Sequence, residues 1–181
     1  AAAGGANVTT FSVEVADTAT IGVGTWSCES PGTANDSYVA GHFAVNGSAG
    51  FSTGNCGLTF NGTTAQDFTT GAEQYSTVTL INTGSPGATD DLNVFGTLDI
   101  NYDLTITDGD FDLAANDPLI YLSGNIIIGA SGLVTKSDSG STVWNLDGSG
   151  PETWTDNSAG QDLGNISIDG SSKVVTLLSS A

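Results

Sequence analysis

Basic residues are almost missing from this sequence. Among its 181 residues only Lys136 and Lys173 are basic, arginine does not occur, and 20 acidic residues give a formal net charge of -18. Proteins that bind nucleic acid neutralise phosphates with Lys and Arg, and anionic membrane surfaces attract the same side chains. The composition therefore excludes nucleic acid and anionic membranes as expected partners. It favours solubility, mutual repulsion between copies and the capture of cations.

Long apolar runs and helical patterns are also missing. No stretch approaches the roughly 18 apolar residues that span a bilayer, so we expect no membrane insertion. No secretion signal opens the sequence, and we expect any such signal to have been removed or to lie upstream of Ala1. Apolar residues nowhere recur at i, i+3, i+4 and i+7 for more than one turn. The sequence therefore predicts an all-β protein.

Cysteine is scarce and methionine is absent, in a chain rich in Ser, Thr, Gly and Asn. We expect the two cysteines, Cys28 and Cys56, to form a disulfide in an exported, extracellular protein. The alternative is a pair of separate buried thiols. The chain also contains Asn-x-Ser/Thr sequons that permit glycosylation without requiring it, which begin at Asn7, Asn35, Asn46, Asn61 and Asn165.

Short segments with a period of two fill the chain between residues 8 and 179, and Gly, Asn or Asp closes each one. In the middle of the chain, apolar pairs recur every six or seven residues, at Leu92/Val94, Leu98/Ile100, Leu104/Ile106 and Phe111/Leu113. This spacing is shorter than that of a sandwich and is typical of a coil that stacks on itself. We predict a parallel β-solenoid over 56–181 with an N-terminal β segment or cap over 1–55. The alternative is a pilin-like β-sandwich completed by strand donation.

An internal repeat supports the solenoid. The same order of apolar and glycine positions occurs twice: Phe60-Asn61-Gly62, Phe68, Tyr75, Val78, Leu80, Leu92 and Val94 recur as Leu146-Asp147-Gly148, Trp154, Leu163, Ile166, Ile168, Val175 and Leu177. A unit that recurs within one chain is the signature of stacked architectures, in which neighbouring units bury a shared core. The repeat predicts that a further strand pair follows the last apolar segment.

The repeated segments carry a resemblance. TFNGTTAQDF, YSTVTLINTG, LNVFGTLDINYDLTITDGDFDL and LGNISIDGSSKVVTLLSS resemble the repeats of large secreted β-helical surface proteins, including adhesin-like filament proteins. The resemblance covers residues 56–181 and implies a solenoid fold and a place at the cell surface. It implies no catalytic residue, and the segment before Cys28 departs from the pattern.

Three carboxylates alternate along one predicted strand, at Asp108, Asp110 and Asp112. Such oxygens suit calcium, which is the one candidate cofactor, although the glutamate of an EF-hand loop is absent. The alternative is an acidic face in contact with solvent, because alternation places all three side chains on one side of the strand. Carboxylates also serve glycosidases, but no arginine is available for an acidic sugar, and we expect no enzyme.

The predicted function is mechanical. The end coils of a solenoid present unpaired backbone groups, and no charged or proline-rich cap follows the last apolar segment. We therefore expect an extracellular structural subunit that forms a homopolymer, assembling head to tail by β-strand complementation in a filament or surface layer. The alternative is a monomeric adhesin module that binds surface glycans through Trp26, Trp144 and Trp154, although tryptophans more often pack in a core. The single histidine, His42, suits a structural or surface position.

Overall fold

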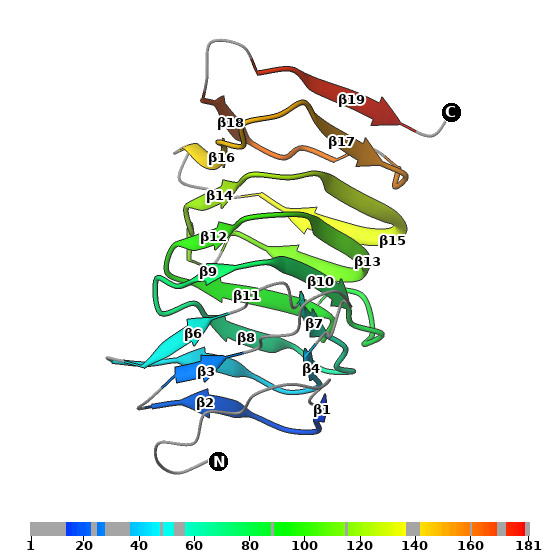
Figure 1. The fold of residues 1–181 in the computed structure, drawn as a ribbon. Helices are drawn as coiled ribbons and strands as arrows, with labels where there is room; N and C mark the ends of the chain where they lie inside the picture. The colour runs from blue at the N-terminus through cyan, green and yellow to red at the C-terminus, as the bar shows by residue number, and fades with distance from the viewer. Residues whose placement is uncertain are drawn as a thin grey trace.

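The protein is all-β in the part of the chain that the structure describes. This computed structural model describes residues 14–22, 25–27, 37–47, 49–52, 57–87, 89–114, 116–136, 142–159, 161–169 and 173–179. Every strand pair in these residues is parallel, and the strands stack into a column (Figure 1). The predicted β-solenoid is confirmed. A sandwich with hairpin-linked antiparallel strands does not describe this arrangement.

The chain winds around three faces in constant order. The first face holds β1 (Glu14–Val15), β4 (Ser37–Val39), β7 (Gly57–Phe60), β10 (Thr77–Ile81), the first parts of β13 (Leu104–Asp112) and β15 (Ile126–Thr135), β17 (Glu152–Asp156) and β19 (Val175–Ser179). The second face holds β2 (Ala19–Ile21), β5 (Phe43–Val45), β8 (Gln66–Thr69), β11 (Asp91–Phe95) and the last parts of β13 and β15. The third face holds β3 (Thr25–Ser27), β6 (Gly50–Ser52), β9 (Gln74–Tyr75), β12 (Leu98–Ile100), β14 (Ile120–Leu122), β16 (Thr142–Leu146) and β18 (Asn165–Ile168).

Strand β13 is long because it covers two faces. Its first part pairs with β10, its last part pairs with β11, and the register shifts between Ile106 and Asp108. Gly109 follows this bulge with φ of +96°, a conformation that other residues rarely adopt. A Cβ at this position would lie 2.8 Å from the backbone oxygen of Asp90 in the neighbouring coil. Glycine therefore allows both the bend and the close approach of the coils.

Alternation fills the inside of the column with apolar side chains. Val78, Leu80, Leu92 and Val94 are fully buried, as are the inward residues of β12 and β13. Near the N-terminal end the core contains a cluster of aromatic rings, including an edge-to-face pair formed by Phe68 and Tyr75 with centroids 5.0 Å apart. Full burial of one such side chain contributes about 1.5–3 kcal/mol, so this interior is the main source of stability.

The coils differ in length, but their register is kept. Side chains that bond to the next coil reach residues between 16 and 29 positions away in sequence. The strands from Glu14 to Ser52 belong to the same column, so the order of faces is the same on both sides of the predicted boundary at residues 55 and 56. The described part of the chain holds no helical segment with the length and hydrophobicity needed to traverse a bilayer.

Candidate functional site: the open end of the solenoid

The C-terminal end of the column exposes apolar side chains that occupy inward positions. Ile166 and Ile168 on β18 align with the buried Trp144 and Leu146 of the coil below, yet they are 41% and 52% exposed. Leu177 on β19 aligns with the buried Trp154 and is 75% exposed. These side chains face inward like the buried residues they align with, and no described residue covers them. The C-terminal end of the column therefore exposes apolar side chains of the kind that form the core elsewhere.

The same end presents free strand edges. Among the described strands β18 pairs only with β16, and β19 pairs only with β17. Both strands lie at the C-terminal end of the column in Figure 1. A parallel strand with one unpaired edge offers a row of N–H and C=O groups to another extended segment. Exposed core and unpaired backbone are thus found together, which is the combination that strand addition uses.

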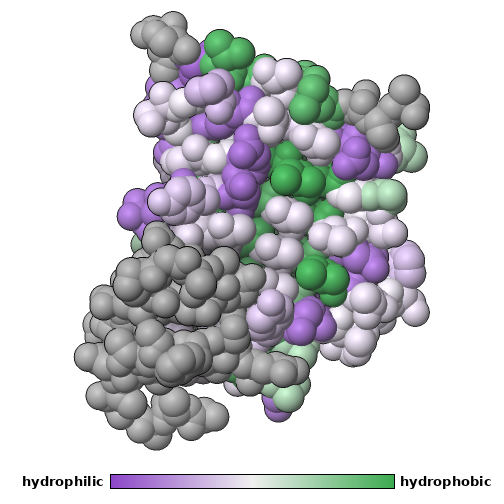
Figure 2. Space-filling view, turned by 45° about the vertical axis from the view of Figure 1, so that its right-hand side comes forward, coloured by the Kyte–Doolittle hydropathy of each residue, from purple (hydrophilic) through white to green (hydrophobic). Residues whose placement is uncertain are grey.

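The sides of the column are different. Large apolar side chains exposed there, Ile81, Phe95, Tyr102, Ile127 and Leu133, are 36–54% exposed, but they occupy outward strand positions or a bend and not inward positions. On the side seen in Figure 2, hydrophobic residues occur in small groups separated by near-neutral and hydrophilic ones. Scattered apolar residues of this kind are normal on soluble proteins, whereas a contiguous apolar patch marks an interaction surface.

A buried ion pair lies under the last strand. Lys173 Nζ is 2.8 Å from Glu152 Oε1, and the two side chains are 2% and 4% exposed. Glu152 begins β17, and Lys173 lies two residues before β19. Sequence reasoning missed this pair, although the internal repeat contained a signal for it: Glu152 occupies the position of Gln66 in the first unit. Removing one partner of a buried pair leaves an unpaired charge, so the pair ties the terminal coil to the column.

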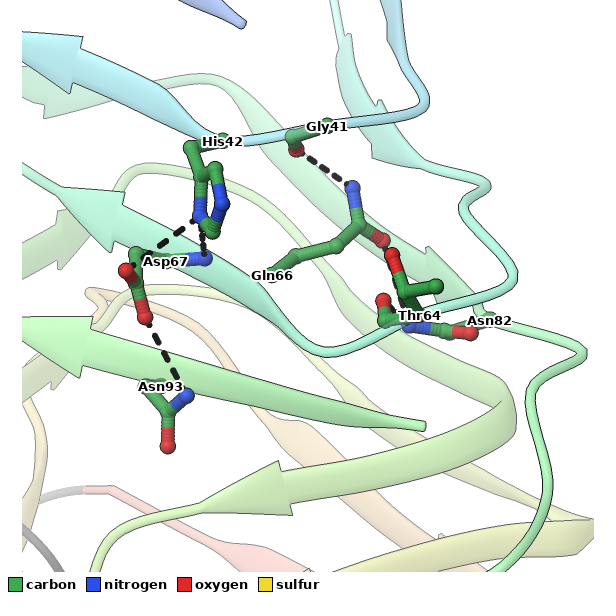
Figure 3. A network of polar contacts seen from close by, with 7 residues as sticks. All are labelled: Gly41, His42, Thr64, Gln66, Asp67, Asn82 and Asn93. Carbon is green, nitrogen blue, oxygen red and sulfur yellow. Dashed lines mark hydrogen bonds and ion pairs between the residues drawn. The ribbon is translucent and has the colours of Figure 1, made fainter. Parts of the chain in front are cut away.

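Gln66 closes the equivalent corner in the first unit with neutral hydrogen bonds. Its Nε2 donates to the carbonyl oxygens of Val39 at 2.9 Å and Gly41 at 2.7 Å, and its Oε1 accepts from Gly62 N at 3.1 Å. Figure 3 shows Gln66 pointing into this corner, between Gly41 on one side and Thr64 and Asn82 on the other. Asn82 Nδ2 donates to Thr64 O at 2.8 Å, so the two fully buried side chains of this corner, Gln66 and Asn82, are both hydrogen-bonded.

Each of the three alternating aspartates accepts hydrogen bonds from the protein itself. Asp108 Oδ1 accepts from Gly109 N, and Asp112 Oδ1 accepts from Ala114 N. Asp110 is buried and accepts from both the backbone N–H and the hydroxyl of Thr135. Within the described ranges no group of three or more His, Cys, Asp or Glu side chains is placed to hold a metal ion. Calcium binding at these residues stays a prediction without an assembled ligand set.

Alternation alone places Asp110 in solvent, and the structure corrects this expectation. Asp110 precedes the buried Phe111 and aligns with the exposed Leu133, so it is on the outer side of β13, but its hydrogen bonds to Thr135 hold it against the next coil and it is only 6% exposed. Burial raises the pKa of the Asp110 carboxyl, the hydrogen bonds from Thr135 oppose this effect, and the carboxylates of Asp112 and Asp91 raise the pKa further. Burial also raises the pKa of Asp91.

The remaining candidates fall into structural positions or outside the described residues. His42 Nδ1 accepts from Asp67 N at 2.9 Å, and Asp67 Oδ1 in turn accepts from Asn93 Nδ2, so this polar row links three coils of the second face (Figure 3). Trp144 and Trp154 are buried, with ring centroids 5.4 Å apart. Trp26 is half-buried against the core.

The disulfide prediction is not tested, because Cys28 and Cys56 lie outside the described residues, as do the sequons at Asn7 and Asn35. Of the other sequon asparagines, Asn46 and Asn165 are exposed and Asn61 is half-buried.

Comparison with known proteins identifies no relative. No family model matches the chain, and no curated protein and no solved structure matches it. The geometry of the column and its open end is therefore the basis on which a function is inferred.

Proposed function

We propose that this chain is a structural subunit of an extracellular filament or surface layer, in which copies join head to tail by β-strand addition at the open end. The observation that carries the proposal is the exposure of Leu177, an inward-facing leucine that is 75% exposed. Covering Leu177, Ile166 and Ile168 removes core-type surface from water, which favours association. The free edges of β18 and β19 supply the backbone partners.

The charge of the chain sets the conditions for assembly. A net charge of -18 makes copies repel each other at low ionic strength, and salt screens this repulsion beyond about 10 Å at 0.1 M. Assembly should therefore increase with salt, and the acidic sides should keep the assembled column soluble. An extracellular location fits the sequons, the cysteine pair and the resemblance to secreted surface repeats.

The alternative function, a monomeric adhesin module that binds carbohydrate, has less support. Sugar-binding sites often stack a ring on an exposed aromatic side chain. Trp144 and Trp154 lie in the core instead, and they pack on Phe111 and on each other. No specific contact among the described residues favours a glycan.

The test compares two charged substitutions at different places on the column. Leu177→Asp places a carboxylate on the open end, and Leu133→Asp places one on an exposed site of the side. Sedimentation velocity over a concentration series, with electron microscopy, should show elongated oligomers for the wild type and for Leu133→Asp. Leu177→Asp should remain a monomer. A wild type that stays monomeric at every concentration and salt level, or a Leu177→Asp variant that assembles normally, would overturn the proposal.

A further inference from the structure

The internal repeat is preserved in the register of the strands. In the first unit Val78 pairs with Leu58 and Val94 pairs with Phe68. In the second unit the corresponding residues pair in the same way: Ile166 with Trp144, Ile168 with Leu146, Val175 with Glu152 and Leu177 with Trp154. The repeat is therefore a structural unit, and each position in one copy has a defined counterpart in the other.

The two units lie on different faces. Strands β7 and β10 are on the first face, whereas their counterparts β16 and β18 are on the third face. Strands β8 and β11 are on the second face, whereas their counterparts β17 and β19 are on the first. Every counterpart is displaced by one face in the same direction. The second unit is thus the first unit moved along the column and turned by one face.

The first unit shows what covers the surface that the second unit leaves open. Leu104 and Ile106 of β13 lie over Val78 and Leu80, and Phe111 lies over Leu92. The single strand β13 covers both β10 and β11, because it bends at the bulge before Gly109. The counterparts of the covered strands are β18 and β19. The open end therefore fits two apolar strands joined by a short bend, the first over β18 and the second over β19.

The N-terminal coil of this same chain has that form. β1 ends at Val15, which packs against the core, and after three intervening residues β2 begins, with Ala19 and Ile21 facing inward. In the described residues β1 pairs only with β4 and β2 pairs only with β5, so each keeps a free edge on the outer side. The strands also follow the winding direction of β13, from one face to the next.

We infer that the open end receives the first coil of a second copy turned by one face, with its β1 over β18 and its β2 over β19. This inference rests on the proposed head-to-tail assembly and adds its orientation. β1 and β2 lie on the first and second faces of their own copy, as the two parts of β13 do, so a turn by one face gives β18 and β19 the same kind of cover that β10 and β11 have. In each possible orientation one of the three incoming strands lies over residues 161–163 of the second face, where no strand is present, so the correspondence with β13 selects the orientation and the number of strand pairs does not.

Cysteine pairs distinguish the orientations. In the turned arrangement Thr20 in the middle of β2 lies opposite Thr176 of β19, and both are exposed on the outer surface. Neighbouring strands are about 4.8 Å apart, which is within the roughly 4.4–6.8 Å between Cα atoms that a disulfide spans. Thr20→Cys with Thr176→Cys should therefore form chains of disulfide-linked copies on mild oxidation.

Two control pairs report the other orientations. Thr20→Cys with Asp162→Cys reports stacking without a turn, and Thr20→Cys with Ser167→Cys reports a turn in the opposite direction. Mass spectrometry of the linked peptides excludes bonds that involve Cys28 or Cys56. Linkage in either control pair, or none in the Thr176 pair although the wild type assembles, overturns the turned orientation and leaves head-to-tail assembly intact. Failure of the wild type to assemble overturns both proposals.

Discussion

The two repeat units have the same structure, but the first is covered by a further coil and the second is not. In the unit that begins at Phe60, Val94 is fully buried under the next coil, whereas its counterpart Leu177 is 75% exposed. The corner below is also different, since Gln66 makes neutral hydrogen bonds and Glu152 pairs with Lys173. The residue pattern is therefore compatible with both burial and exposure, and the presence of a covering coil decides which occurs.

The largest expected difference comes from the same substitution in both units. Val94→Asp places a carboxylate in the dry core and should lower the free energy of unfolding by more than about 4 kcal/mol, or prevent folding. Leu177→Asp should change the free energy of unfolding of the monomer by about 0.5 kcal/mol or less, because this side chain is already in water. Denaturant unfolding at low protein concentration measures both. Equal losses would mean that Leu177 is covered in the monomer.

The next largest effect concerns the buried ion pair. Glu152→Gln restores the residue of the first unit but leaves Lys173 unpaired, and Lys173→Met leaves Glu152 unpaired. Each should cost about 3–5 kcal/mol of local stability, whereas the double variant should lie near the wild type or above it. Hydrogen exchange of the β19 amides reports this locally, with the amides of β10 as an internal reference. Additive losses in the double variant would contradict a coupled pair.

A smaller effect is expected at the corner glycines. A Cβ on Gly62 would lie 2.6 Å from Ala40 O, and a Cβ on Gly148 would lie 2.2 Å from Ser123 O. Gly62→Ala and Gly148→Ala should each cost about 1–3 kcal/mol, because a backbone atom of the neighbouring coil has to move. Gly150→Ala is the matched control, since nothing lies within 4 Å of its Cβ position. Thermal melts should show loss at the first two sites and none at Gly150.

The smallest effect is the pH dependence from Asp110. Its pKa is raised in the folded protein, chiefly by burial, so its contribution to stability is present below the ordinary aspartate pKa and is lost as pH rises through the raised value. Asp110→Asn should therefore reduce the pH dependence of the free energy of unfolding above about pH 4, by under about 1 kcal/mol. Melting temperatures measured across this pH range should vary less in the variant than in the wild type. Asparagine can keep both contacts with Thr135, since its Oδ1 accepts from the backbone N–H and its Nδ2 donates to the hydroxyl oxygen. The loss of stability from the substitution itself should therefore be small.

Asp162→Asn provides a control of opposite sign. The hydrogen bond from Lys136 lowers the pKa of Asp162, so its contribution is present above the ordinary aspartate pKa and is lost as pH falls. Profiles that change in the same direction for both variants would contradict the assignment at Asp110.

The sequence predicted the fold because the information is local. A period of two with Gly or Asn at each turn specifies short strands, and apolar pairs six or seven residues apart specify faces that are too short for a sandwich. The internal repeat was visible for the same reason. Its turn by one face was not, because the chain takes up different numbers of residues at the corners and the pattern does not state which face a segment occupies.

The candidate site was predicted only as a general property of solenoid ends. The sequence did not identify Ile166, Ile168 and Leu177 as exposed, since the same apolar alternation is buried elsewhere in the chain. It also missed the burial of Asp110, because this outward side chain is covered through its hydrogen bonds to Thr135 in the next coil. Both depend on contacts between residues more than twenty positions apart.

The displacement by one face also determines how such a column meets its surroundings. Three successive units would carry equivalent residues to three different sides, so any surface feature of one unit would recur on each of the three faces in turn. A rod of this kind has no front or back. In the proposed filament, a neighbouring rod would therefore meet equivalent surfaces whichever side it approached.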